Sequence, residues 1–341
     1  MYAICEGMGF RHLSSKEQQV YKIILQTFST SADFFDCSNI DRSVDVMRVI
    51  QIALGDNPSV VYFNKNQIQM EEAGGSKRFI LSGLVPKPEA AQMNLALDDA
   101  VNKAISYINT ASQDEYSLLL KLYEYLQENT KYDTLELQAM AKGRSTNPNS
   151  HNAFGALVNK TAVCDGFASA FVLLAKNLGF DCMLVVGTSA YDTGKSTGHA
   201  WNIVKIGNKK YHMDATWDAR RFREFDEYSY AYFAVSDEDV NYDHYWDNLI
   251  VPPCMCNDLS YYVKYGLYAG NFEQAVSIIK SARHGSNDLI RLRISQKAKL
   301  PDYAGDRLAQ VYMDAVSKSG VRIQVSYGWN INTRCFIAKT M

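Results

Sequence analysis

The sequence has few of the residues that mark unusual protein classes. Seven prolines and 20 glycines in 341 residues are too few for a collagen-like or low-complexity chain. Neither charge sign is in large excess, because 35 Lys and Arg residues face 37 Asp and Glu residues. Without a strong net field to attract phosphate backbones or anionic lipid, we expect no nucleic-acid partner.

Long hydrophobic runs are also missing. No segment approaches the roughly 18 to 20 consecutive apolar residues that a membrane-spanning helix needs, so we predict no membrane span. The N-terminal segment lacks the basic stretch and apolar run that are typical of an export signal. This favours a cytoplasmic location for the chain as given, and a secreted or cell-surface location stays open if a leader was removed.

The cysteines do not form a recognisable framework. There are seven, an odd number, scattered through a chain that is long enough to form a core without disulfides. A reducing compartment is therefore favoured. Cys254 and Cys256 make a C-x-C pair with no second pair or nearby histidine, which lacks the ligand number that zinc requires. We predict no metal and no organic cofactor.

What remains is the composition of a folded globular protein, with 47% hydrophobic and 21% charged residues. The periodicity of apolar residues predicts an α+β protein in three parts. These are a mainly helical N-terminal region with a short strand pair (1–112), a core (113–256) and a small α+β C-terminal domain (257–341). No prediction of oligomeric state follows.

Finer patterns place some elements within these parts. The strand pair is expected at 60–63 and 79–81, followed by two long helices between 88 and 130. Residues 142–152 are polar and predict an exposed loop. In the C-terminal part, strands are expected at 261–267, 289–294, 321–325 and 335–338.

A helix is predicted to begin at Cys164. Apolar residues recur at helical spacing from Phe167 to Leu178, and Gly179 is typical of a helix C-terminus. The N-terminus of a helix carries free N–H groups and partial positive charge, which favour the thiolate form of a cysteine. Because the thiolate is the nucleophilic form, Cys164 is a candidate nucleophile.

A hairpin is predicted around the Gly-Asn turn at 207–208. Counting residue pairs back from this turn places Trp201 opposite Asp214 and His199 opposite Thr216. His199 and Asp214 are then diagonal neighbours on one face, with Cα atoms about 7 to 8 Å apart, which one hydrogen bond between side chains can span. His212 falls opposite Ile203 and is expected to be a surface or hydrogen-bonded histidine rather than a second base.

Together these residues have the chemistry of an activated nucleophile. Cys164 needs a base to take its proton, and His199 provides one. His199 needs a partner that fixes its tautomer and stabilises the imidazolium, and Asp214 provides that. The expected reaction is acylation of the thiol followed by deacylation.

Four blocks, in this order, carry a resemblance to a known family: Ala156-Leu157-Val158-Asn159, Val163-Cys164-Asp165-Gly166-Phe167-Ala168, His199-Ala200-Trp201-Asn202 and Asp214-Ala215-Thr216-Trp217-Asp218. Over about 115–250 the sequence resembles the transglutaminase-like superfamily of papain-fold cysteine enzymes, in its bacterial branch. The resemblance implies a helix, opened by the nucleophilic cysteine, packed on an antiparallel sheet. It also implies Cys164 as nucleophile, His199 as general base and acid, and Asp214 as the orienting carboxylate.

Members of this family transfer acyl groups from amide bonds, as transglutaminases or as proteases and amidases, and some have lost catalysis. The resemblance thus implies a cysteine hydrolase or acyltransferase acting on a peptide or protein, with protease or amidase activity slightly favoured over transfer to an amine. The alternative is a catalytically silent peptide- or glycan-binding module on the same fold.

The surroundings of the three residues are less closely specified. The oxyanion hole is expected to use the backbone N–H of Cys164 with a second donor, either Asn152 or Tyr132. Phe167 stands where the family frequently has tyrosine, so it offers no hydroxyl. The candidates for the cleft wall are Trp201, Phe167 and Trp217.

Overall fold

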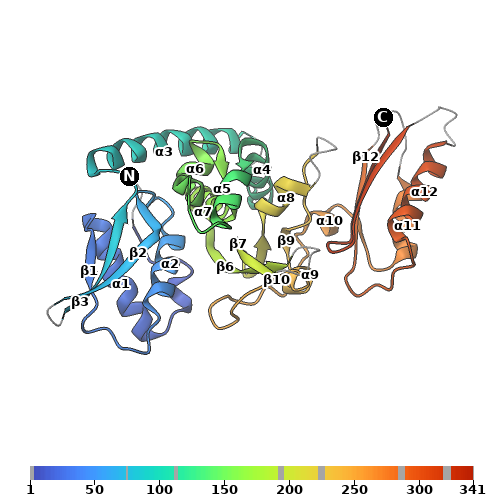
Figure 1. Ribbon diagram of the computed structural model, residues 1–341. Coiled ribbons are helices and arrows are strands. Elements are labelled where there is room, and N and C mark those ends of the chain that lie inside the picture. The colour runs from blue at the N-terminus through green and yellow to red at the C-terminus, as the bar shows by residue number, and fades with distance from the viewer. Residues whose placement is uncertain are drawn as a thin grey trace.

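The computed structural model describes residues 4–73, 76–110, 114–190, 196–221, 227–282, 289–317 and 324–340. Over these ranges the protein is an α+β structure, as predicted. In Figure 1 the chain passes from the N-terminal elements at one side, through a central sheet with its helices, to the C-terminal elements at the other. Among the described helices, none combines the length and apolar character required to cross a bilayer.

The N-terminal elements form two helices beside a three-stranded sheet. Ser14 begins the first helix through a capping box with Glu17, and Asp45 caps the second by accepting from the N–H of Arg48. The elements are η1 (Phe10–His12), α1 (Ser15–Thr30), β1 (Phe34–Asp36), α2 (Val46–Asp56), β2 (Phe63–Ala73) and β3 (Ser76–Gly83).

The predicted strand pair is present but longer than expected. β2 begins where the sequence pattern placed the end of the first strand, and β3 lies between β1 and β2 in the sheet. Most of β2 was not predicted, because beyond Phe63 the strand is largely polar and side chains such as Glu71 and Glu72 are exposed. Such a strand shows no alternation of apolar and polar residues.

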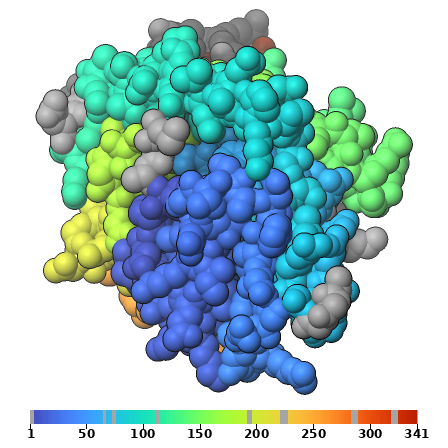
Figure 2. Space-filling model, turned by 90° about the vertical axis from the view of Figure 1, so that its left-hand side faces the viewer, coloured from blue at the N-terminus to red at the C-terminus, as the bar shows by residue number. Residues whose placement is uncertain are grey.

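Two long helices follow, as predicted: α3 (Lys87–Ile108) and α4 (Glu115–Asn129). Figure 1 shows α3 running over both the N-terminal elements and the central part, and Figure 2 shows it above the N-terminal residues on the side view. Buried residues of α3 and α4 belong to the same hydrophobic cluster as the central helices. That cluster also reaches Cys335 and Ile337, so the boundaries predicted at 112 and 256 stay a prediction.

The central part holds a five-stranded antiparallel sheet in the order β10-β6-β7-β8-β9. Helix α7 (Cys164–Asn177) packs against β6 and β7, and the side-chain amide of Asn202 on β7 donates to the carbonyl of Ala168 on α7. The other elements are β4 (Lys131–Tyr132), α5 (Thr134–Met140), η2 (Pro148–His151), α6 (Ala153–Leu157), β5 (Thr161–Ala162), β6 (Asp181–Ala190), β7 (Ser196–Ile206), β8 (Lys209–Met213), α8 (Ala215–Arg221), β9 (Phe233–Val235), α9 (Asp237–Val240) and β10 (His244–Tyr245).

The hairpin of β7 and β8 has the predicted turn and register near the turn, but it ends sooner. Asn202 pairs with Met213, and the expected ladder pairs of Trp201 with Asp214 and of His199 with Thr216 do not form. The reason is that a carboxylate oxygen of Asp214 accepts from the N–H of Trp217 at 3.0 Å, so the chain turns into α8 instead of extending the strand.

The C-terminal elements form a four-stranded sheet with two helices beside it. Its order is β11-β12-β14-β13, with β11 and β12 parallel and the other pairs antiparallel. The elements are α10 (Tyr261–Lys264), β11 (Tyr268–Ala269), α11 (Phe272–Ser281), β12 (Leu289–Ile294), α12 (Ala304–Ser317), β13 (Val325–Asn330) and β14 (Cys335–Thr340).

The strand expected at 261–267 is wrong, because its first half is the short helix α10. The side chain of Ser260 caps this helix by accepting from the N–H of Val263, and Gly266 follows with a positive φ of 69°. Capping here overrides the strand preference of a tyrosine-rich segment. The strand expected at 321–325 lies largely outside the described residues.

Candidate active site

A cavity of about 690 Å³ brings together residues from the N-terminal and central parts. Cys164 and His199 both line it, so the predicted nucleophile and base share one space. Apolar side chains from α2, β2, α5 and β6 are among the other lining groups. They include Leu54, Phe63, Leu137, Met140, Leu184 and Val186.

Cys164 is the first residue of α7, as predicted, and its thiol is partly exposed. The N–H of Val163, the residue before this helix, donates to the carbonyl of Ser150 at 3.0 Å. This hydrogen bond holds the start of α7 against the segment that precedes α6. The thiol therefore lies at the positive end of a 14-residue helix and faces the cavity.

The close approach behind Cys164 depends on Gly166. A Cβ atom built at this position lies 2.3 Å from the carbonyl oxygen of Ser150, which is backbone and has little freedom to move. We expect Gly166→Ala to lower the free energy of unfolding by about 1 to 3 kcal/mol through overpacking. Gly198→Ala is the control, because a Cβ there meets nothing within 4 Å. Urea unfolding of the two variants measures the difference, and equal midpoints would contradict this account of the turn.

His199 and Asp214 are in direct contact, with Nε2 of the histidine 2.7 Å from Oδ2 of the aspartate. Both side chains are buried. The backbone of Asp214 is fixed at both ends, since its N–H donates to the carbonyl of Tyr232 and its carbonyl accepts from the hydroxyl of Tyr123. The carboxylate thus has a defined position although it lies beyond the last ladder pair of β8.

The charges in this group depend on one another. Burial lowers the pKa of His199, but the Asp214 carboxylate and a hydrogen bond with Cys164 outweigh burial and raise the pKa to about 9. Burial likewise raises the pKa of Asp214, and the imidazoles of His199 and His244 more than reverse this, leaving that pKa well below its usual range. His199 therefore favours the imidazolium form and Asp214 the carboxylate form.

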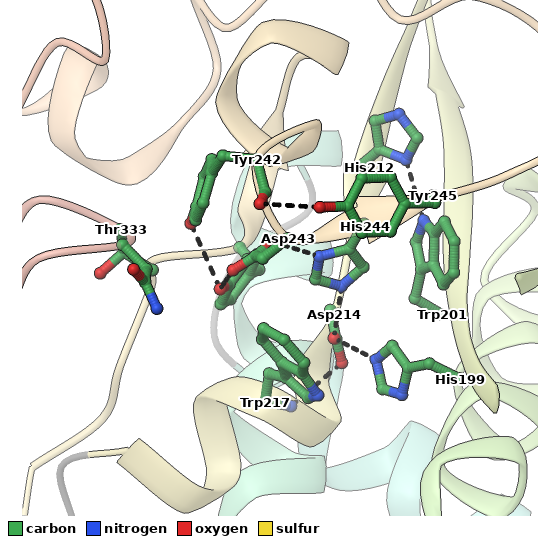
Figure 3. Close-up of polar contacts among 12 residues, drawn as sticks. His199, Trp201, His212, Asp214, Trp217, Tyr242, Asp243, His244, Tyr245 and Thr333 are labelled. Atoms are coloured by element: carbon green, nitrogen blue, oxygen red, sulfur yellow. Dashed lines mark hydrogen bonds and ion pairs between the residues drawn. The ribbon is translucent and has the colours of Figure 1, made fainter. Parts of the chain in front are cut away.

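A second histidine, His244 on β10, contacts the same carboxylate and was missed in the sequence. Its Nε2 lies 3.1 Å from Oδ2 of Asp214, and its Nδ1 lies 2.6 Å from Oδ1 of Asp243. Figure 3 shows Asp214 between the two imidazole rings. His244 lies in an aromatic-rich segment without periodicity. The available signal was the scarcity of histidines, six in the chain, together with the adjacent acidic residue.

A third histidine lies on another part of the cavity wall. His151 has Nε2 3.0 Å from a carboxylate oxygen of Glu136 and Nδ1 3.0 Å from one of Asp165, the residue after Cys164. The sequence predicted an exposed loop here. That is wrong for its second half, because η2 buries Ser150 and His151 against α7.

The other predicted site residues are divided between cavity and core. Asn152, Tyr132 and Trp217 line the cavity, whereas Phe167 and Trp201 do not. The expected role of Phe167 and Trp201 in the cleft wall is wrong. Phe167, on α7, is buried in the main hydrophobic cluster, and Trp201 is buried in a smaller cluster on the sheet.

The two suggested oxyanion donors are placed differently by their contacts. The side-chain oxygen of Asn152 caps α6, and its nitrogen donates to the carbonyl of Val61 at 3.3 Å, so that amide is already hydrogen-bonded. Tyr132 lies on β4 and is partly exposed to the cavity. The roles of both residues stay predictions.

Two sets of described side chains place three ligand atoms within 4.8 Å of one another: His199 with Asp214 and His244, and His212 with Asp237 and Cys254. In the second set the indole N–H of Trp201 donates to Nδ1 of His212, so Nε2 carries the hydrogen and donates to Asp237. His244 presents both ring nitrogens to carboxylates. Neither His212 nor His244 then has a free lone pair for a metal, and hydrogen bonding accounts for both sets.

Comparison with known proteins places the central part in a family. Residues 102–215 match the model of the transglutaminase-like superfamily, and this part of the chain is a transglutaminase-like domain. The match contains Cys164, His199 and Asp214.

Individual proteins are similar to parts of this chain. The kyphoscoliosis peptidase of Mus musculus is 24% identical over 186 residues, which are 50% of this chain and 27% of the mouse protein. The Homo sapiens kyphoscoliosis peptidase is 31% identical over 106 residues, 26% of this chain and 16% of the human protein. A crystal structure of a TGase aligns with a TM-score of 0.33 and 20% identity, covering 44% of this chain and 43% of that one. The matches thus span about a quarter or less of the curated relatives.

Proposed function

We propose that this protein is a cysteine-dependent acyltransferase or hydrolase that attacks a peptide or side-chain amide through Cys164, His199 and Asp214. The observation that carries the proposal is the cavity that Cys164 and His199 share, with His199 bonded to a buried carboxylate on its far side. A histidine held in this way gives up and takes back a proton at a defined atom.

The reaction begins from a thiolate and an imidazolium. The sulfur of Cys164 attacks the amide carbon, and the carbonyl oxygen becomes an oxyanion that the Cys164 N–H stabilises. When the C–N bond breaks, the imidazolium of His199 gives its proton to the departing amine, which leaves a thioester on Cys164. His199 then takes a proton from the incoming water or amine, the C–S bond breaks, and the starting state returns.

The cavity also indicates what part of a substrate lies beside the scissile amide. The side chains of Leu54, Phe63, Leu137 and Met140 contribute an apolar lining, and Asp165 and His151 contribute polar groups. Such a lining favours a peptide with an apolar side chain near the reactive amide. Leu54 and Phe63 bring the N-terminal elements into this wall beside α5, so these elements take part in substrate recognition in this proposal.

Hydrolysis and transfer to an amine share the thioester and differ in the group that resolves it. The test is to incubate the protein with a glutamine-containing peptide library, with and without a labelled primary amine, and to analyse the products by mass spectrometry. Incorporation of label indicates a transglutaminase. Cleavage or deamidation without incorporation indicates a protease or amidase, and no reaction at all would contradict the proposal.

The second candidate is a catalytically silent peptide-binding module. The observation that favours it is the size and apolar lining of the cavity, which accommodate a peptide whether or not the thiol reacts. The two candidates differ under turnover conditions. A binding module retains the library peptides unchanged, and it does so equally in a Cys164→Ala variant.

The raised pKa of His199 predicts the alkaline limit of activity. Because the pKa is about 9, the imidazolium that protonates the leaving amine persists through neutral pH. We expect kcat/KM to fall as the pH rises through about 9. A steady-state pH profile measures this, and a fall centred near the ordinary histidine value of about 6.5 would show that Asp214 does not hold the proton on His199.

A further inference from the structure

His244 is buried, and the reaction proposed above gives it no role. Its side chain is 1% exposed, and both ring nitrogens face carboxylates, Asp214 through Nε2 and Asp243 through Nδ1. Two carboxylates at these distances are both satisfied only when both nitrogens carry hydrogen. Burying an ionisable ring between two acids costs free energy that burying an apolar side chain does not. Packing alone therefore does not explain a histidine at this position.

The contacts of Asp214 show what His244 contributes. One carboxylate oxygen, Oδ2, accepts from both His199 at 2.7 Å and His244 at 3.1 Å, and the other, Oδ1, accepts from the N–H of Trp217 at 3.0 Å. Three donors from three different elements thus fix the plane of the carboxylate. Removing the His244 donor leaves one hydrogen bond to each oxygen and freedom for the group to turn away from His199.

The chain of hydrogen bonds continues beyond His244. The other oxygen of Asp243 accepts from the hydroxyl of Tyr232 at 2.5 Å, and the hydroxyl of Tyr242 lies 3.3 Å from that of Tyr232. His244, Asp243 and Tyr232 are all buried. The close approach of β10 to β6 requires glycine at position 187, because a Cβ at Gly187 would lie 2.3 Å from the carbonyl oxygen of Tyr245.

We propose that His244 is a positioning residue for the acyl transfer, holding the Asp214 carboxylate in the orientation in which it meets His199. This inference rests on the proposed function, since it assigns a role within the same reaction. His244 does not line the cavity and is not a catalytic residue. It acts through Asp214, as Asp214 acts through His199.

The charges support this role. Burial lowers the pKa of His244, and the hydrogen bonds to Asp214 and Asp243 raise it further than burial lowers it. The titratable groups that face the ring are His199 from β7, His212 from β8, Asp214 after β8, and Tyr232 and Asp243. From His199 to Asp243 the chain then alternates between imidazole rings and carboxyl groups, each in hydrogen-bond contact with the next.

The expected effect follows from the loss of these contacts. In His244→Gln one amide nitrogen replaces two ring nitrogens on opposite sides of the imidazole, so Asp214 and Asp243 cannot both keep their donor. The Asp214 carboxylate is then less firmly held against His199, and His199 binds its proton less tightly. We expect the His199 titration to move to lower pH by about half a unit or more. We also expect kcat to fall about 10-fold to 100-fold with little change in KM, because Asp214 does not touch substrate.

The experiment combines titration and kinetics. Histidine ring signals of the full chain are followed by NMR against pH in the wild type, in His244→Gln and in the control His212→Gln. His212 suits the control because it is a buried histidine on the same sheet, bonded to Asp237 rather than to Asp214. The proposal expects a shift of the His199 titration in His244→Gln and none in His212→Gln. The proposal is wrong if His244→Gln folds and both its His199 titration and its kcat equal those of the wild type.

If His244→Gln fails to fold, a measurement on the wild type alone still tests the role of His244. The nitrogen chemical shifts of the His244 ring at neutral pH should be those of an imidazolium, with both nitrogens protonated. A neutral tautomer would overturn the proposal. Because titration needs no substrate, it separates the two claims: a shift of His199 without any turnover in the wild type contradicts the proposed function, and turnover without the shift contradicts the role of His244.

Discussion

Replacing Cys164 with alanine is expected to remove all amide cleavage and amine incorporation. The thiolate makes the bond to the acyl group, and no other described group on the cavity wall can form the thioester. Cys164→Ser keeps a nucleophilic atom, although a smaller one, but its hydroxyl does not form an ion pair with His199. We expect its turnover to lie about 10³-fold or more below that of the wild type. Product formation from the peptide library measures both variants.

The matched control is Cys256→Ala. Cys256 is also a partly exposed free thiol, but it lies outside the cavity lining and should keep full activity. Turnover that survives in Cys164→Ala, or that falls equally in Cys256→Ala, would contradict the assignment of the nucleophile. The thermal midpoints of both variants should stay close to that of the wild type, since each change removes only a sulfur atom.

Replacing His199 with glutamine should have the second-largest effect. The amide keeps a donor for Asp214 but neither takes the thiol proton nor gives one to the leaving amine. We expect kcat/KM to fall about 10³-fold to 10⁴-fold, as for the loss of the base in other triads. The rate of acyl-enzyme formation in a single turnover measures the acylation step directly.

The control for this variant is His212→Gln. His212 is buried and its Nε2 lies 2.8 Å from a carboxylate oxygen of Asp237, so the two variants lose comparable hydrogen bonds. The structural cost should be similar, whereas only His199→Gln should lose the reaction. Comparable losses of kcat/KM in both would mean that burial of a histidine in this sheet, and not proton transfer, determines the activity.

The part of the site that the sequence predicted is the part that short patterns encode. Helical spacing after Cys164 placed the thiol at the start of α7, and the turn at 207–208 fixed the register near it. The contact between His199 and Asp214 was expected from that register, although the ladder stops before reaching them. The hydrogen bond survives because Asp214 caps α8 and its second oxygen turns back toward β7.

The rest of the site depends on contacts between segments that no local pattern links. His244 reaches Asp214 across 30 residues, because β10 pairs with β6 at the edge of the sheet. His151 was assigned to an exposed loop on the basis of polar residues that instead satisfy one another and Glu136. The N-terminal wall of the cavity likewise arises from packing of α2 against β6, which a sequence does not show.

The most direct measurement of the central claim is the pH dependence of alkylation of Cys164 by iodoacetamide, resolved by site with mass spectrometry. Cys5, an exposed thiol in the same chain, is the internal reference. The account predicts rapid modification of Cys164 already at about pH 6, at least about 10-fold faster than Cys5, and loss of this advantage in His199→Gln. If Cys164 and Cys5 follow the same pH profile, and His199→Gln changes neither, Cys164 and His199 do not form an ion pair and the proposed chemistry is wrong.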